Sequence, residues 1–353
     1  MRFLGMTART GVERTVVLAA LILVVVWPLG LSTYYAHQIL TQVFFVGIVA
    51  ASVTFLSAYG GMVSFAQLAL FGVSGFVYGN ATTHDSKGLN LGLSPWVGIV
   101  LAIAITMAMG LVFGALASRS SGIYFLMITL TFAVIANLVF GSVTDVSGFG
   151  GISGINPPGV LLNGAGQHKE VAADALFYVA LIAAIAIYML VRYIVRTPFG
   201  IALQGVRDDP VRMASLGFNV PLHRTVAFGV GAFMSSIAGI LFVWWNGHID
   251  PASIDLGQNI NVLLIAVIGG LARIEGAWIG AFAFYAVSNV IQNHWPSGIP
   301  GIGGTFFTII GLIFLGVVVV SPDGLLGIWA RYGSGERLRR RGTPPGAEPE
   351  AGA

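Results

Sequence analysis

Charged residues are scarce in this sequence, and cysteine is absent from it. Only 9% of the 353 residues are charged, whereas 56% are hydrophobic. Soluble domains carry about 25% charged residues, so this composition cannot cover a water-exposed surface and excludes a soluble globular protein. The absence of cysteine excludes a disulfide framework, a thiolate metal site and a cysteine nucleophile.

The apolar residues are grouped in long blocks. Each block has about 18–25 residues, the length that a helix needs to cross a hydrocarbon layer of ~30 Å. Alternation of apolar and polar residues, which is typical of outer-membrane strands, does not occur in them. The sequence therefore predicts an all-α integral membrane protein, a polytopic bundle of about ten transmembrane helices with cytoplasmic N- and C-termini. The expected spans are 15–35, 38–58, 62–80, 95–117, 121–141, 175–193, 225–246, 256–272, 276–292 and 303–321.

Three segments follow from this reading. Residues 1–14 are predicted to form a cytoplasmic N-terminal segment, residues 15–328 the transmembrane domain, and residues 329–353 a cytoplasmic tail. The tail mixes Arg, Gly, Pro and Glu with few apolar residues, which indicates disorder. The first apolar block is an uncleaved helix or a signal peptide. Its length, Val16–Leu31, favours the helix.

The span count depends on residues 256–292, where Gly269, Gly270, Arg273 and Glu275 interrupt a long apolar stretch. Two short helices joined by a cytoplasmic Gly-Gly turn place the arginines of the tail inside, as basic residues of membrane proteins prefer. One long tilted helix with a glycine kink is the alternative.

Ionisable residues are missing from the interiors of the predicted spans. Proton-driven transporters usually carry such groups within the membrane, and no GxxxxGK[ST] phosphate loop occurs either. Energy must therefore come from a partner, or transport is passive. The six histidines fall in loops or at span ends, so we expect neither a metal site nor a catalytic residue, and no nucleic-acid partner.

The longest predicted cytoplasmic loop, at about 194–224, begins with the signals of a short helix. Thr197 is a good N-cap and Pro198 suits the first helical position. Phe199, Leu203 and Val206 then recur on one face. We expect a helix with one apolar side.

A second short helix follows in the same loop. Asp209 and Pro210 repeat the start signal, and Gly217 is a suitable C-terminal residue. Asp208 and Arg212 have the spacing of a helical ion pair. The two helices would present a compact, partly apolar element to the cytoplasm, or they would lie on the membrane surface.

Five stretches of the chain, in order, resemble branched-chain amino-acid ABC permeases of the LivM type. They are YGGMVSFAQ at 59–67, the loop sequences RTPFGIALQGVRDDP at 196–210 and LGFNV at 216–220, VIGGLARIEG at 267–276, and SPDGLLG at 321–327. Two positions depart from the family pattern: Ala214 replaces a frequent Glu, and Gln67 replaces a frequent His.

The resemblance implies that the loop is the coupling element, which docks onto cytoplasmic ATP-binding subunits. It also implies a second permease subunit in a heterodimer, an extracytoplasmic solute-binding protein, and a place in the bacterial inner membrane. ATP is then used by the partner subunits, and this chain binds no cofactor. The residues expected to couple to the ATPase are Thr197, Pro198, Phe199, Gly200, Leu203, Arg207, Asp208, Asp209, Leu216 and Gly217.

Uncharged polar residues within the spans are candidates for the solute pathway. Amides and hydroxyls can bind an ammonium or carboxylate group, and they can equally form hydrogen bonds between helices. Ser64 and Gln67 are expected on one helical face. The candidates for the pathway are Ser64, Gln67, Thr129, Asn137 and Asn259.

The external segment from Gly141 to Asp174 is rich in glycine. Glycine allows close approach of the backbone to another surface, and the segment could equally be a flexible connector.

The leading hypothesis is a permease subunit that imports branched-chain or related small amino acids, driven by a separate ATPase. The alternatives are a urea or short-amide permease of the same family and a passive channel for small neutral solutes. A membrane-embedded enzyme is disfavoured, because no His/Asp/Glu cluster lies within a predicted span.

Overall fold

The computed structural model describes residues 33–83, 89–148, 150–155, 157–159 and 169–294, together with the single positions 311, 312, 315 and 324. The predicted N-terminal segment 1–14 and tail 329–353 lie outside the described residues. The spans predicted at 15–35 and 303–321 lie mostly outside them.

The described chain is helical, apart from one pair of short strands. The elements are α2 (Thr33–Gly60), α3 (Ala66–Thr82), α4 (Pro95–Ala117), α5 (Ile123–Ser142), α6 (Thr144–Ser147), α8 (Lys169–Arg196), α9 (Pro198–Asp208), α10 (Pro210–Ser215), α11 (Val220–Asn246), η2 (Pro251–Ile254), α12 (Leu256–Gly269) and α13 (Glu275–His294). The strands β1 (Ile152–Ser153) and β2 (His248–Ile249) pair antiparallel. The helical class is confirmed, and each of the eight inner predicted spans corresponds to one helix.

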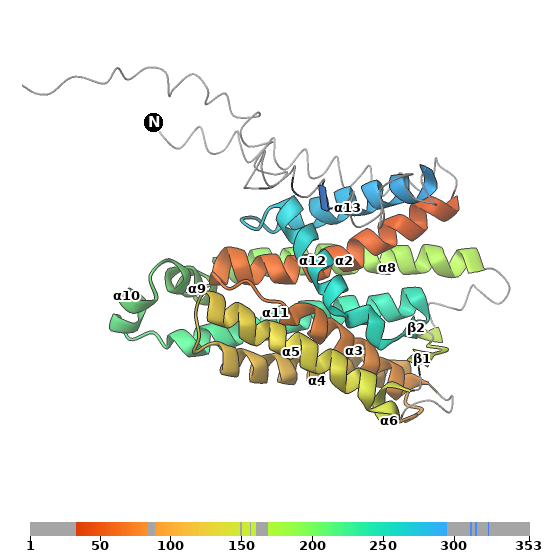
Figure 1. Ribbon diagram of the computed structural model, residues 1–353, viewed down its shortest axis with the longest axis horizontal. Helices are drawn as coiled ribbons and strands as arrows, with labels where there is room; N and C mark the ends of the chain where they lie inside the picture. The colour runs from red at the N-terminus through yellow and green to blue at the C-terminus, as the bar shows by residue number, and fades with distance from the viewer. Residues whose placement is uncertain are drawn as a thin grey trace, which may run out of the picture.

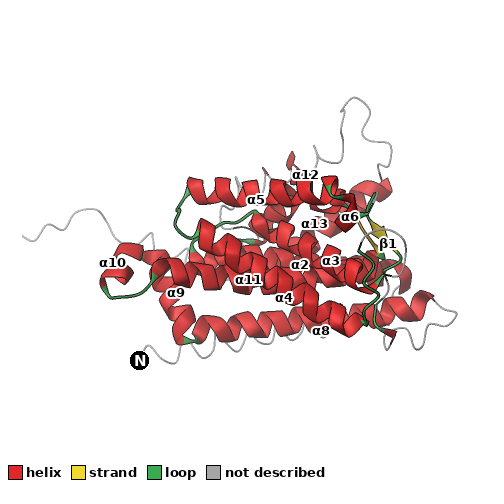
Figure 2. Ribbon diagram, turned by 90° about the horizontal axis from the view of Figure 1, so that it is seen from below, coloured by secondary structure: helices red, strands yellow, loops and turns green. Residues whose placement is uncertain are grey.

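The bundle has two distinct ends. Figures 1 and 2 show α9 and α10 at one end and the β1–β2 pair at the other. We call these the loop end and the strand end.

Two helices lie in the middle of the bundle and three at its periphery. Among the described residues, the helices long and apolar enough to cross a membrane are α2, α4, α5, α8 and α11. In the most apolar stretch of each helix, the buried share is 83% in α2 and 72% in α11. In α4, α5 and α8 it is only 22%, 28% and 33%. The outer helices therefore present apolar side chains to the surroundings, as lipid-facing helices do.

Small residues let α11 contact its neighbours α3 and α4 closely. A Cβ at Gly239 of α11 would clash with the Phe71 carbonyl oxygen and the Ser74 hydroxyl of α3, and one at Gly110 of α4 would clash with Ala232 of α11. Contact at this range is how membrane helices gain packing energy where the hydrophobic effect between them is weak.

A glycine stripe on α3 receives isoleucines from the strand end. A Cβ at Gly72 would clash with Ile254, one at Gly75 with Ile249, and one at Gly79 with Ile155. The stripe therefore fixes η2, β2 and the segment after β1 against α3.

The Gly-Gly turn predicted at 269–270 is confirmed. Helix α12 ends at Gly269, α13 begins at Glu275, and Gly270 has φ +110°, a conformation that L-residues rarely adopt. Cβ atoms at Gly269 or Gly280 would clash with backbone atoms of the opposite helix. The two helices thus form a hairpin in backbone contact, and the single kinked helix is wrong.

Candidate coupling and transport site

The two short helices predicted in the cytoplasmic loop are present with their predicted caps. Thr197 Oγ1 accepts a hydrogen bond of 3.3 Å from the Gly200 N–H, and Asp209 Oδ1 accepts one of 2.9 Å from the Arg212 N–H. Proline occupies the first turn of both α9 and α10. Side-chain caps satisfy N–H groups that a helix start leaves without partners.

Gly217 terminates the second helix as predicted, shortly after its last residue Ser215. Gly217 has φ +90°, and the Phe218 N–H donates to the Met213 carbonyl over 3.1 Å. A left-handed glycine with such a backward bond is the usual termination of a helix. The chain can then turn directly into α11.

The α9–α10 pair has one buried side and one exposed side. Leu203 and Val206 are fully buried, and Phe199 stacks on the His223 ring at 5.8 Å between centroids. On the outer side, Ile201, Val211 and Leu216 are 63%, 74% and 65% exposed. The pair is anchored to the bundle and still presents apolar side chains at the loop end.

The predicted ion pair between Asp208 and Arg212 is wrong. Asp208 instead pairs with Arg207, at 2.7 Å between Nη2 and Oδ1. Asp209 has an extended backbone, with φ −151° and ψ 91°. This break ends the first helix, so positions 208 and 212 do not share one helical face.

Arg207 also connects α9 to the end of α2. Its Nη1 donates a short hydrogen bond to the Ala58 carbonyl oxygen. A Cβ at Gly61 would lie 2.7 Å from the Arg207 Cγ. The guanidinium thus satisfies a carbonyl in the last turn of α2, which lacks a helical partner.

A second polar contact at the loop end joins α8 to α13. Glu275 Oε1 accepts hydrogen bonds of 3.1 Å from both Arg192 Nη1 and Tyr188 OH. The Arg192 guanidinium lies 5.7 Å from the centre of the Tyr188 ring. The sequence marked Glu275 only as an interruption of an apolar stretch, because its partners lie in a distant helix.

The pathway candidates Ser64 and Gln67 do not share a helical face, so that prediction is wrong. Ser64 precedes α3, and its hydroxyl accepts from the Ala66 N–H over 3.1 Å. Gln67 lies in the first turn of α3 and is fully buried. The reason is that residues 61–65 form a non-helical link, which begins at Gly61 with φ +65°.

Gln67 belongs to a polar chain across three helices. Its Oε1 accepts from Ser235 Oγ of α11 over 2.9 Å, and Ser235 Oγ lies 3.0 Å from Ser52 Oγ of α2. The Gln67 Nε2 has no hydrogen-bond partner among the described residues. This arrangement fits a bond between helices, and contact with solute stays a prediction.

The other pathway candidates lie along α5 and α12. Thr129 Oγ1 accepts from the Phe65 N–H over 3.3 Å, which brings it to the 61–65 link. Asn137 Nδ2 donates to the Pro251 carbonyl over 2.8 Å, and Asn259 is buried in α12. The α3–α5 seam beside Thr129 is closed by a cluster of Ala69, Ala133 and Ala136.

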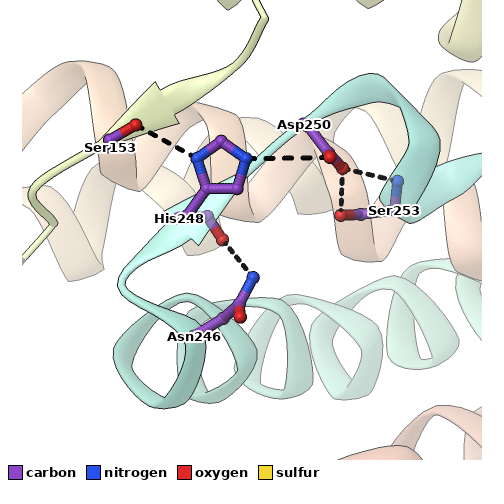
Figure 3. Close-up of polar contacts among 5 residues, drawn as sticks. All are labelled: Ser153, Asn246, His248, Asp250 and Ser253. Carbon is purple, nitrogen blue, oxygen red and sulfur yellow. Dashed lines mark hydrogen bonds and ion pairs between the residues drawn. The ribbon is translucent and has the colours of Figure 1, made fainter.

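The strand end carries a polar cluster that sequence reasoning missed. His248 Nδ1 lies 3.2 Å from Ser153 Oγ, and His248 Nε2 lies 3.7 Å from Asp250 Oδ2 (Figure 3). Asp250 Oδ1 caps η2 by accepting from the Ser253 N–H over 2.8 Å. The cluster ties β1 to the segment between α11 and α12.

The glycine-rich segment that was predicted to be external packs closely on the backbone of β2, as one of its two interpretations expected. Gly151 has φ +98°, and a Cβ there would clash with the Ile249 carbonyl oxygen. Only glycine fits at this position, so the β1–β2 pair depends on it.

The fold and its ends define a class: a polytopic helical membrane protein with a short helical element docked at one end, the architecture of a transport permease. Residues 35–321 match the family model of the branched-chain amino acid transport system permease component. The chain belongs to this family and is a multi-pass inner-membrane protein.

Individual relatives agree with the family match. The chain is 25% identical to the high-affinity branched-chain amino acid transport system permease protein LivM of Salmonella typhimurium, over 89% of this chain and 75% of that protein. It is 24% identical to a probable LivM of Methanocaldococcus jannaschii, over 76% of this chain and 81% of that protein. The Escherichia coli LivH permease protein is 28% identical over 43% of this chain and 46% of its own length.

Proposed function

We propose that this chain is the transmembrane permease subunit of an ABC importer for branched-chain or related small amino acids, and that separate cytoplasmic subunits hydrolyse the ATP. A second permease subunit completes the pathway, and an extracytoplasmic binding protein delivers the solute. In this proposal the chain has a transport role and the partner subunits have the catalytic one. The similarity to LivM proteins supports the solute class.

The observation that carries the proposal is the α9–α10 pair. Its inner side is fixed by Leu203 and Val206, and its outer side exposes Val211 and Leu216 beside charged residues. A soluble partner could bury these side chains, at about 1.5–3 kcal/mol each. The exposed side therefore has the properties of a docking surface for a cytoplasmic ATPase, with the loop end facing the cytoplasm.

Copurification tests the docking surface. Val211→Asp and Leu216→Asp should each lower the affinity for the ATPase subunits about ten- to hundredfold. Leu91→Asp is the matched control, because Leu91 is 57% exposed and lies at the strand end. It should leave copurification unchanged.

Transport assays test the energy source. Leucine uptake into proteoliposomes should require the ATPase subunits and ATP. Uptake by this chain alone, without nucleotide, would refute the proposal in favour of a passive channel.

A further inference from the structure

Two parts of the chain repeat the same pattern of helix, Gly-Gly and helix. Helix α2 ends at Gly60 and α3 begins at Ala66, while α12 ends at Gly269 and α13 begins at Glu275. The links 61–65 and 270–274 are equal in length, and each begins with a glycine of positive φ, +65° and +110°. The two links are therefore alike in length and in the backbone conformation of their first residue.

Both links lie at the loop end, where α9 contacts the 61–65 link and α8 contacts Glu275, the residue that follows the 270–274 link. Arg207 of α9 binds the end of α2 and lies against Gly61. Arg192 and Tyr188 of α8 bind Glu275, the first residue of α13. The Tyr59 ring lies within electrostatic reach of Arg207, Arg192 and Glu275, so the two contacts are neighbours.

The corner between α8 and α9 is built to move as one body. Thr197 Oγ1 donates to the Ile194 carbonyl over 2.6 Å, and Gln204 Nε2 donates to the Val195 carbonyl over 3.4 Å. A Cβ at Gly200 would clash with the Ile194 carbonyl oxygen. Such close backbone packing transmits displacement rather than absorbing it.

The first residue of α13 is joined to the rest of the hairpin by equally close contacts. Gly276 and Gly269 are in backbone contact, and Trp278 packs so tightly on α2 that a Cβ at Gly47 would lie 2.5 Å from its Cδ1. A displacement of Glu275 is therefore passed to α13 and to its packing partner α2.

We propose that Arg192 and Glu275 are positioning residues for energy coupling, which make the 270–274 link follow the α8–α9 corner together with the 61–65 link. This inference rests on the proposed function, because it assigns the driving movement to ATPase docking on α9 and α10. The two links then act as paired hinges. Glycine at the start of each permits the change in backbone angles that a hinge needs.

Transport coupling in proteoliposomes tests this role in the full complex with ATPase, second permease subunit and binding protein. The readouts are leucine uptake, ATP hydrolysis and the amount of assembled complex. Glu275→Gln should lower the leucine moved per ATP hydrolysed about two- to fivefold, the most that an ion pair with side chains 47% and 30% exposed can supply. Assembly and basal hydrolysis should stay unchanged. Asp145→Asn is the matched control, since Asp145 is an exposed carboxylate on α6 at the strand end.

Charge exchange separates positioning from stability. Arg192→Glu combined with Glu275→Arg should restore most of the coupling ratio that either single change removes. A Glu275→Gln protein with the wild-type ratio would overturn the inference. So would an exchange variant that assembles but stays uncoupled, or a loss of assembly in Glu275→Gln, in both single exchanges and in the double exchange. Absence of ATP-driven uptake in the wild-type complex would instead refute the proposed function and the inference with it.

Spin labels test directly whether the 270–274 link stays attached to α8. The sequence contains no cysteine, so introduced cysteines are the only ones labelled. The distance between labels at Tyr193→Cys on α8 and Ala272→Cys in the link should be the same with and without ATP. In the Glu275→Gln background, the separation should change with ATP. An ATP-dependent separation in the wild-type background would overturn the inference.

Discussion

Removal of the Ser235 hydroxyl should destabilise the bundle, whereas removal of the neighbouring Ser236 hydroxyl should not. Both side chains are fully buried in α11. Ser235 Oγ connects Gln67 of α3 and Ser52 of α2, at 2.9 Å and 3.0 Å. Among the described residues, the hydrogen bond of Ser236 Oγ goes to the Phe233 carbonyl of its own helix, over 2.7 Å.

The difference between Ser235→Ala and Ser236→Ala has a definite expected size. Loss of the Ser235 hydroxyl leaves Gln67 Oε1 buried without its described donor, which costs about 1–3 kcal/mol. Measured hydrogen bonds between membrane helices average about 0.6 kcal/mol, with values up to about 1.7. We expect Ser235→Ala to cost about 1–2 kcal/mol and Ser236→Ala less than about 0.5. The gain in helix propensity from serine to alanine is the same for both and cancels.

Unfolding in mixed micelles measures the two costs. The free energy of unfolding is followed by circular dichroism as the fraction of denaturing detergent rises, and leucine uptake is measured in parallel. Equal destabilisation by the two substitutions would refute the assignment of Ser235 to a bond between helices. Reduced affinity for leucine with unchanged stability would instead place the Gln67 cluster in the solute pathway.

Two further predictions concern backbone contact and capping. Gly280→Ala should prevent stable packing of the α12–α13 hairpin, because its Cβ would clash with the Ile265 carbonyl oxygen; overpacking costs at least about 1–3 kcal/mol. The expected result is loss of monodisperse protein on size exclusion, while Gly141→Ala, which meets nothing within 4 Å, should behave like the wild type. Thr197→Ala removes the cap of α9 and should cost about 0.5–2 kcal/mol locally. Faster proteolysis between α8 and α10, without loss of overall helicity, would show this local destabilisation of α9. An unchanged cleavage rate would contradict the capping role of Thr197.

Helix positions at α4, α9 and α10 were predictable because local chemistry determines them. Pro95 starts α4 as the residue expected at a first turn, and the predicted and observed bounds agree. The caps Thr197 and Asp209 act within three residues of their own position. Capping and first-turn signals act over a few residues, so a single sequence is enough to detect them.

The start of α3 was not predictable, because a remote contact decides it. Residues 62–65 are apolar or weakly polar and contain no helix breaker, so the span was expected to begin at Met62. In the structure, the Phe65 N–H donates to the Thr129 hydroxyl, 64 positions away in sequence. The same limit applies to Glu275, whose partner Arg192 is 83 positions away. Only the assembled bundle brings such groups together.

The distribution of charge explains why coupling should proceed by helix displacement. The described ion pairs lie at the two ends: Arg192–Glu275 and Arg207–Asp208 at the loop end, and His248–Asp250 at the strand end. Ionisable groups in the membrane interior are costly and are kept where a proton or ion must be relayed. The described helices carry their ionisable groups near their ends. A proton or ion relay through the membrane interior would therefore find no such groups there among the described residues. What connects the ends is backbone contact through glycines, which transmits movement without placing charge in the apolar layer.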